Sequence, residues 1–239
     1  MTAEFKKVSD LEILERSAFA EAEIDILEDS LKILAAHRFA ILDGGSGLAR
    51  LVNLLQWDAG SSVEYLDDDA IYADQAIHFA IHHLMDALPQ SKSPYAMLYA
   101  ECVASCADLY MLGKLSNAGL ETDFTHETLE SLGSYYEQYA SGENQLESVF
   151  QFVLASPFDA MKEAAGFLYS FVGSLLRNPV DPGKAGQMCV DRFYPLAHHF
   201  NVSNWILTIR SHFPEIDENI PEPIGLLLDE TEFVNRFKW

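Results

Sequence analysis

The amino-acid sequence predicts an all-α fold: a single bundle-like domain of about eight to ten helices, with residues 95–115 as its buried central helix. Apolar residues recur at helical spacing along almost every segment, and no stretch shows convincing β-strand alternation. The chain has 239 residues, of which 49% are hydrophobic, so it can bury a sizeable core. Residues 95–115 are apolar nearly all round the helix, which is typical of a helix buried on every side.

The predicted helices have recognisable start and stop signals. Ser9, with Glu12 three residues later, predicts a capping box for the first helix, and the glycine-rich residues 43–47 end it. The aspartates at 67–69 suit the positive end of the third helix, and the Ser-Pro pair at 93–94 suits the start of the fourth. The predicted helices span about residues 9–42, 47–57, 67–88, 94–115, 126–140, 145–154, 158–176, 183–200 and 203–213.

One domain accounts for most of the chain. The best boundary candidate, residues 177–184, contains two prolines, but apolar helices flank it on both sides. We therefore predict an all-helical domain over residues 1–213. Residues 214–239 form an acidic, proline-punctuated C-terminal segment that we expect to pack on that domain.

The charge balance restricts the partners. The chain carries 15 Lys and Arg against 37 Asp and Glu, a net charge of −22, without a basic cluster. This excludes nucleic acid and an anionic membrane surface, and leaves a cationic protein partner, a metal ion or a neutral small molecule. The first thirty residues carry charges throughout, and the longest apolar run, 164–176, is too short to span a bilayer. We therefore expect a soluble, cytoplasmic protein.

The third predicted helix carries a polar ridge beside its apolar face. Asp74, His78 and His82 lie four residues apart, with His82 drifting toward solvent and His83 on the opposite flank. One carboxylate and two imidazoles on one ridge are a candidate set of metal ligands. The simpler interpretation is an Asp–His hydrogen bond at the border of the core, with His82 exposed.

The central helix carries two acids, Glu101 and Asp108, on the same side. Because an unpaired buried carboxylate is costly, each must be paired, neutralised or bound to a cation. Arg or Lys from a neighbouring helix, a histidine such as His78, or a metal ion satisfies this requirement, and ion pairing is the simplest. The metal hypothesis predicts Asp74, His78, Glu101 and Asp108 as ligands of iron or manganese, although the spacing departs from the Glu-x-x-His pattern of di-metal bundles.

Other patterns point to structure rather than chemistry. The glycines at 44–47 lack the Gly-Lys-Ser/Thr of a phosphate loop, and no Gly-x-Ser-x-Gly elbow is present. Cys102, Cys106 and Cys189 are expected to be reduced thiols, because helical i,i+4 cysteines are too far apart for a relaxed disulfide. The aromatic residues between 150 and 171 are expected in the core; they could also line an apolar ligand pocket.

Two functions follow from these observations. The first is an acidic, all-helical interaction protein, such as an adaptor, an inhibitor or a chaperone-like factor, that engages a protein partner. The alternative is a non-haem iron or manganese carboxylate-bundle enzyme that oxidises an apolar small molecule with oxygen. An apolar-ligand carrier is a lesser third hypothesis.

Overall fold

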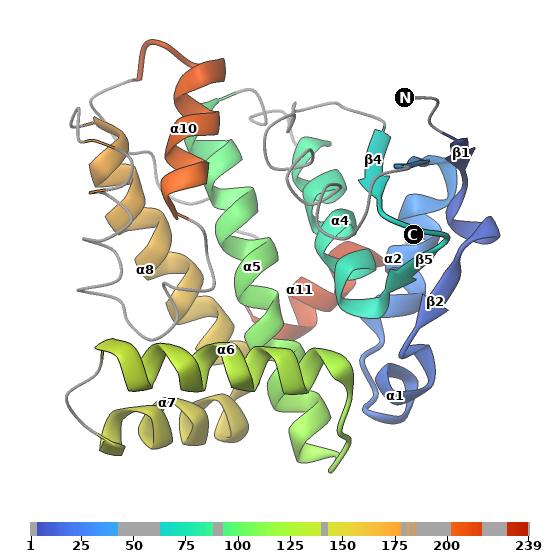
Figure 1. Ribbon diagram of the computed structural model, residues 1–239, viewed down its shortest axis with the longest axis horizontal. Helices are drawn as coiled ribbons and strands as arrows, with labels where there is room; N and C mark the ends of the chain where they lie inside the picture. Colours follow the sequence, from blue (N-terminus) through green and yellow to red (C-terminus); the bar gives the residue numbers. More distant parts are fainter. Residues whose placement is uncertain are drawn as a thin grey trace.

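The computed structural model describes residues 4–42, 63–87, 93–139, 143–177, 181, 184, 202–216 and 229–238 (Figure 1). Nine α-helices lie in this part of the chain: α1 (Arg16–Glu21), α2 (Ile26–Ile33), α4 (Ala73–Asp86), α5 (Pro94–Asn117), α6 (Asp123–Tyr139), α7 (Glu143–Ala155), α8 (Pro157–Arg177), α10 (Val202–His212) and α11 (Glu230–Phe237). The predicted all-α, multi-helix class is therefore confirmed. The predicted helix 47–57 and most of the predicted helix 183–200 lie outside the described residues.

The N-terminal region differs from the prediction. The expected helix over 9–42 is wrong, because this stretch contains two short helices, α1 and α2, between two strands. Ser9 lies in a single 3-10 turn, so it does not cap a long helix. The apolar runs in this stretch are short. In runs of this length, the spacing of apolar residues does not distinguish a helix from a strand.

Five short strands also correct the expectation that the chain has none: β1 (Glu4–Lys6), β2 (Glu12–Leu14), β3 (Arg38–Ile41), β4 (Val63–Leu66) and β5 (Ala70–Tyr72). One sheet has the order β1-β3-β4, with β3 antiparallel to β1 and parallel to β4. The other pairs β2 with β5 in parallel. Strands of three or four residues are too short to show alternation in a sequence.

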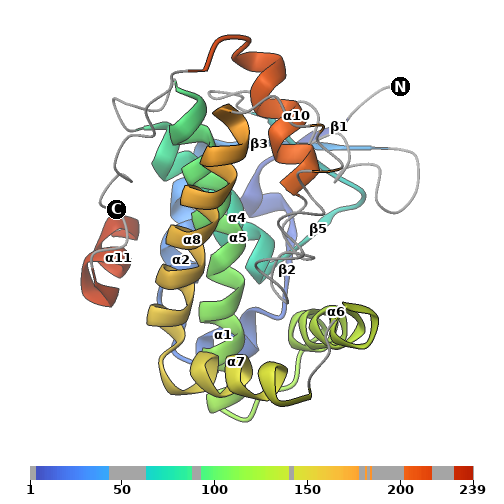
Figure 2. The ribbon, with the colours of Figure 1, turned by 90° about the vertical axis from the view of Figure 1, so that its left-hand side faces the viewer.

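Helix α5 runs through the middle of the molecule, as predicted. The Ser93 hydroxyl accepts a hydrogen bond from the Ala96 N–H at 3.0 Å, Pro94 occupies the first turn, and Gly119 follows the helix with a φ of +71°. Almost every side chain of α5 is buried, between α4 on one side and α8 on the other. Figures 1 and 2 show α5 and α8 side by side, with α6 and α7 crossing near one end. Within the described ranges, no helix is both long and apolar enough to cross a membrane.

Helix α4 begins later than predicted. The aspartates at 67–69 lie in a bend between β4 and β5, and Tyr72 is the N-cap of α4. Asp68 accepts a hydrogen bond from the Ala70 N–H, so it stabilises the bend rather than a helix start. The helix packs against both α2 and α5, so it buries more than one face.

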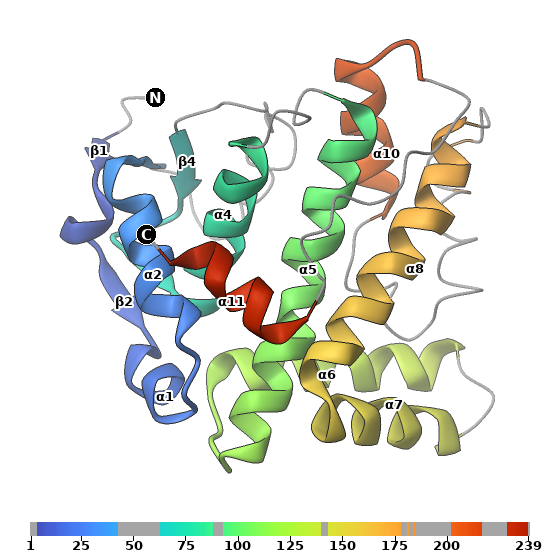
Figure 3. The same ribbon diagram turned by 180° about the vertical axis from the view of Figure 1, so that it is seen from behind.

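The last described helix, α11, lies on the side of the molecule that faces away from the viewer in Figure 1. Figure 3 shows it there, between α2 and α5. Phe233 and Phe237 are fully buried, and the Phe233 ring packs against Tyr110 and Phe158. The Tyr110 hydroxyl donates a hydrogen bond to Glu230 at 2.9 Å. A C-terminal segment distinct from the domain over residues 1–213 stays a prediction.

Candidate metal site

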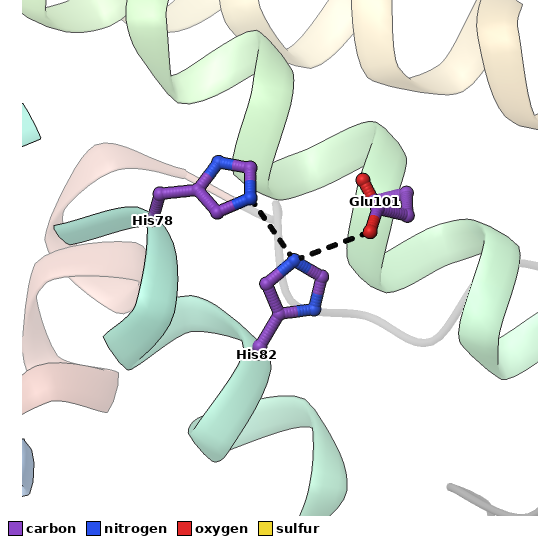
Figure 4. Close-up of side chains that lie close together, drawn as sticks. All are labelled: His78, His82 and Glu101. Atoms are coloured by element: carbon purple, nitrogen blue, oxygen red, sulfur yellow. Dashed lines mark hydrogen bonds and ion pairs between the residues drawn. The ribbon is translucent and has the colours of Figure 1, made fainter. Parts of the chain in front are cut away.

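Two histidines of α4 and one glutamate of α5 converge in the interface between these helices (Figure 4). The Nε2 atoms of His78 and His82 lie 3.1 Å apart, and His82 Nε2 lies 3.5 Å from Glu101 Oε1. Residues four apart on a helix present their side chains on the same face, so the two imidazoles are neighbours. All three potential ligand atoms lie within 4.8 Å of one another.

These separations match the edges of a coordination polyhedron. Ligand atoms bound at about 2.1 Å are about 3.0 Å apart in an octahedron and about 3.4 Å apart in a tetrahedron. The His78–His82 distance of 3.1 Å and the His82–Glu101 distance of 3.5 Å lie close to these two values. A small adjustment of side-chain torsions therefore brings two nitrogens and one oxygen onto a single first-row metal ion.

Two of the three converging residues are buried and the third is partly exposed. His82 is 8% exposed and Glu101 is 7% exposed, whereas His78 has intermediate burial. Burial lowers the pKa of His82 well below its ordinary value, and the neighbouring His78 and His83 lower it further. Burial also raises the pKa of Glu101 to about 8, with a further contribution from Glu64. At neutral pH, His82 is therefore an uncharged imidazole and Glu101 retains its proton, so their 3.5 Å contact is not a salt bridge.

More carboxyl groups surround the three converging residues. Burial and then Asp108 raise the pKa of Asp74 to about 8, and its Oδ1 atom is buried without a hydrogen-bond partner. On strand β4, burial and then Asp86 raise the pKa of Glu64 to about 8. Among the described residues, the charges acting on Asp74, Glu64 and Glu101 are all carboxylates. The predicted Arg or Lys partner of Glu101 is therefore not found in this part of the chain.

The sequence prediction and the structure share two residues of the site. His78 and Glu101 come together as expected, while Asp74 and Asp108 lie outside the convergent group but close enough to interact with each other. The expectation that His82 faces solvent is wrong. It rested on one buried face for α4, whereas α2 and α5 pack on different sides of the helix. The i,i+4 spacing from His78 was the signal that identifies His82 as the second imidazole.

Among the residues that the structure describes, the remaining candidates show no comparable convergence. Cys102 and Cys106 are buried and form no disulfide, as predicted, and burial raises the pKa of Cys106 well above its ordinary value. The rings of His37 and His83 meet edge to face at 4.1 Å, and burial followed by His83 lowers the pKa of His37 to about 4. Cys189 and the adjacent histidines at 198–199 lie outside the described residues.

The aromatic residues predicted for the core divide into two groups. Phe158 and Tyr169 are buried, whereas Phe152 and Phe167 are partly exposed at 37% and 41%. Phe167 stacks on Phe171 with a centroid distance of 5.9 Å. An apolar-ligand pocket lined by these residues stays a prediction.

Comparison of the chain with protein-family models, with curated proteins and with solved structures gives no match. The candidate site therefore rests on its own geometry and electrostatics.

Proposed function

We propose that this protein binds one divalent transition-metal ion through His78, His82 and Glu101. The observation that carries the proposal is the convergence of two imidazole nitrogens and one carboxylate oxygen at ligand-to-ligand distances, in a largely buried helix interface. Two further partly buried carboxyl groups, Glu64 and Asp74, on which carboxylates are the only charges that act among the described residues, support it. A metal ion supplies the positive charge that such a cluster needs to ionise.

Iron or manganese suits this ligand set best. Two histidines and one carboxylate that leave coordination positions open are the ligands of non-haem Fe(II) oxygenases, whereas structural zinc sites use four protein ligands. The reaction class that we propose is oxygen-dependent oxidation of an apolar small molecule. The three residues hold the ion between α4 and α5, and the packing of these helices excludes bulk water from it.

Elemental analysis tests metal binding directly. The untagged chain is purified without chelator, and its iron, manganese and zinc contents are measured before and after incubation with each metal under anaerobic conditions. We expect close to one ion per chain after incubation, with iron or manganese retained through gel filtration. Less than about one-tenth of an ion for all three metals contradicts the proposal.

Matched variants locate the ion. His82→Ala and Glu101→Gln each remove one proposed ligand, and we expect each to weaken metal affinity at least about 100-fold. The controls are His126→Ala and Glu163→Gln, which change exposed residues of the same types on α6 and α8. Circular dichroism of every variant separates loss of a ligand from loss of the fold. Unchanged affinity in both ligand variants excludes this site.

The acidic composition supports a second candidate function, interaction with a cationic protein partner. The net charge of −22 favours rapid, charge-led association. The test is capture of a basic protein on the immobilised chain at increasing salt. We expect the yield to fall steeply between 0.05 and 0.5 M salt, on the order of the range over which screening becomes strong. A yield that does not depend on salt contradicts a charge-led partner.

A further inference from the structure

Strand β2 has an open edge. Among the described strands it pairs only with β5, so one of its two edges has no strand beside it in this part of the chain. Figure 1 shows β2 on the outer side of β5. The strand ends at Leu14, because Glu15 has a φ of +60° and turns the chain into α1. An open strand edge is a template on which another extended segment can pair.

The backbone of Ile13 faces this open edge. In a parallel pair, alternate residues of a strand form the hydrogen bonds to the neighbouring strand. Glu12 is in register with Ala70, and its N–H donates to the Asp69 carbonyl at 3.0 Å. The backbone groups of Glu12 and Leu14 are therefore directed toward β5. The N–H and carbonyl of Ile13, between them, point away from β5, where an added strand can pair with them.

A surface groove of about 570 Å³ lies on the same side of β2. All three residues of β2 line it, together with residues of α1 and α2, whereas no residue of β5 does. The lining is part apolar (Ile13, Leu14 and Ala20) and part acidic (Glu12, Glu15 and Glu28). An extended segment directs successive side chains to opposite faces. A segment that alternates apolar and basic residues therefore matches this lining.

The charges of the groove favour a cationic occupant. Among the described residues that line it, Arg16 is the only cation, and Glu28 holds it through two hydrogen bonds at 2.8 and 2.7 Å. No described Lys or Arg pairs with Glu12 or Glu15. Backbone N–H groups of residues 123–124 donate to the Glu15 carboxylate and fix its position at the end of β2. Two acids of the groove are thus left for a basic partner.

We propose that this groove binds an extended basic segment of a partner protein, which adds as a strand to the open edge of β2 through the N–H and carbonyl of Ile13. The inference rests on the second candidate function, interaction with a cationic protein, and gives it a site and a mode of binding. A second copy of this chain is a poorer occupant, because each copy carries a net charge of −22. The metal site plays no part in it.

A synthetic peptide tests the mode of binding on the full chain. The peptide has about six residues, the usual length of a strand, with Lys alternating with Val and a fluorophore at one end. Fluorescence anisotropy at low salt measures its affinity, and hydrogen exchange reports whether the Ile13 amide becomes protected. A second peptide of the same sequence, methylated on every backbone nitrogen, keeps the charge but cannot pair as a strand.

Two pairs of variants locate the contact. Ile13→Pro removes the outward N–H, and proline is tolerated where the N–H of an edge strand faces solvent. Ile13→Val is its control, because it keeps the N–H. Glu12→Lys reverses an acid of the groove, and Glu163→Lys makes the same change at an exposed position on α8. Circular dichroism verifies the fold of each variant.

We expect Ile13→Pro to weaken binding at least about tenfold and Ile13→Val to leave it within about twofold. The methylated peptide should bind at least about tenfold more weakly than the unmodified one. Glu12→Lys should weaken binding about fivefold at low salt, and Glu163→Lys less than about twofold. The Ile13 amide should exchange more slowly when the peptide is bound.

Equal affinity of the wild-type chain for the two peptides overturns the inference, because charge alone then explains binding. Equal affinity of wild type and Ile13→Pro overturns it as well. If Ile13→Pro does not fold, the methylated peptide and Glu12→Lys decide the question. Salt-dependent capture of basic proteins without these differences leaves the second candidate function standing and removes this site. Failure of the chain to bind any basic peptide or protein removes both.

Discussion

The two sides of α5 are both buried, yet they carry different chemistry. Toward α8 the helix presents tyrosines and a glycine, and toward α4 it presents Glu101 and Asp108. The α8 side is closely packed, whereas the α4 side holds the buried acid Glu101, whose burial opposes folding unless a proton or a cation accompanies it. The two sides of α5 therefore contribute to the free energy of folding in opposite directions.

Close approach defines the α8 side. A Cβ atom on Gly113 would lie 2.6 Å from the backbone oxygen of Val153 and 2.7 Å from a side-chain carbon of Pro157, so only glycine fits there. Near the other end of α5, Tyr169 of α8 meets Tyr99 and Tyr95 edge to face, with centroid distances of 5.3 and 6.5 Å. These contacts stabilise the fold without any requirement for a ligand.

The largest expected effect is on this apolar side. Tyr169→Ala removes a buried ring and its two aromatic contacts, so we expect the free energy of unfolding to fall by about 3–5 kcal/mol. Urea denaturation followed by circular dichroism measures the change. Tyr169→Phe is the control, because it keeps the ring and isolates the contribution of the hydroxyl group. A loss below about 1 kcal/mol for the alanine variant contradicts the packing described for α8.

On the α4 side, we expect a bound metal ion to raise the free energy of unfolding. Mn²⁺ at about 100 times its dissociation constant raises the free energy of unfolding by about 2.7 kcal/mol if it binds only the folded state. Differential scanning calorimetry with and without the ion measures this effect. His82→Ala should lose it while His126→Ala retains it. An equal shift in both variants places the ion elsewhere.

Helix α5 itself could be predicted well from the sequence, whereas the residues at its interface with α4 could be predicted only in part. The Ser93-Pro94 start, the all-round apolar pattern and the buried side of Glu101 could be predicted, because each depends on residues within the helix. The inward position of His82 could not, because it depends on a second helix packing against a face of α4 that the helical pattern alone assigns to solvent.

The N-terminal region was the least predictable part for a related reason. Each of its strands has three or four residues, and β3 finds one of its partners, β4, more than twenty residues further along the chain. Short, mostly apolar runs such as 38–41 fit helix and strand equally well until that pairing is known. Glu64 was missed because its burial arises from this same pairing.

The pH dependence of stability distinguishes acids that keep their protons from acids that are ion-paired. The folded state raises the pKa of Glu101 to about 8, so between pH 4.5 and 8 it retains a proton that the unfolded chain releases. Stability of the metal-free protein therefore falls as pH rises through this window, by at most about 1.4 kcal/mol per pH unit for this group.

Glu101→Gln should remove that contribution and make the alkaline decline shallower, while Glu64 and Asp74, whose pKa values are also raised to about 8, still contribute. Glu163→Gln leaves the decline unchanged. Denaturant melts of metal-free protein at pH 6, 7 and 8 provide the comparison. Stability that rises between pH 6 and 8 contradicts the protonated state assigned to Glu101.

His37 acts in the opposite direction. Its pKa is lowered to about 4, so the folded protein prefers the uncharged imidazole and stability is lost as pH falls below 6.5.

The smallest expected effect concerns a carboxylate with far better geometry than Glu101. Arg16 donates two hydrogen bonds to Glu28 at 2.8 and 2.7 Å, but both side chains are 52% exposed. Water already solvates both charges, so we expect Arg16→Ala to cost no more than about 1 kcal/mol and the cost to shrink in 1 M salt. Chemical denaturation at low and high salt measures it. If Arg16→Ala lowers the free energy of unfolding by more than about 2 kcal/mol, the geometry of an ion pair matters more than its burial in this protein. The exposed Glu28 and the buried Glu101 then no longer differ in the way described here.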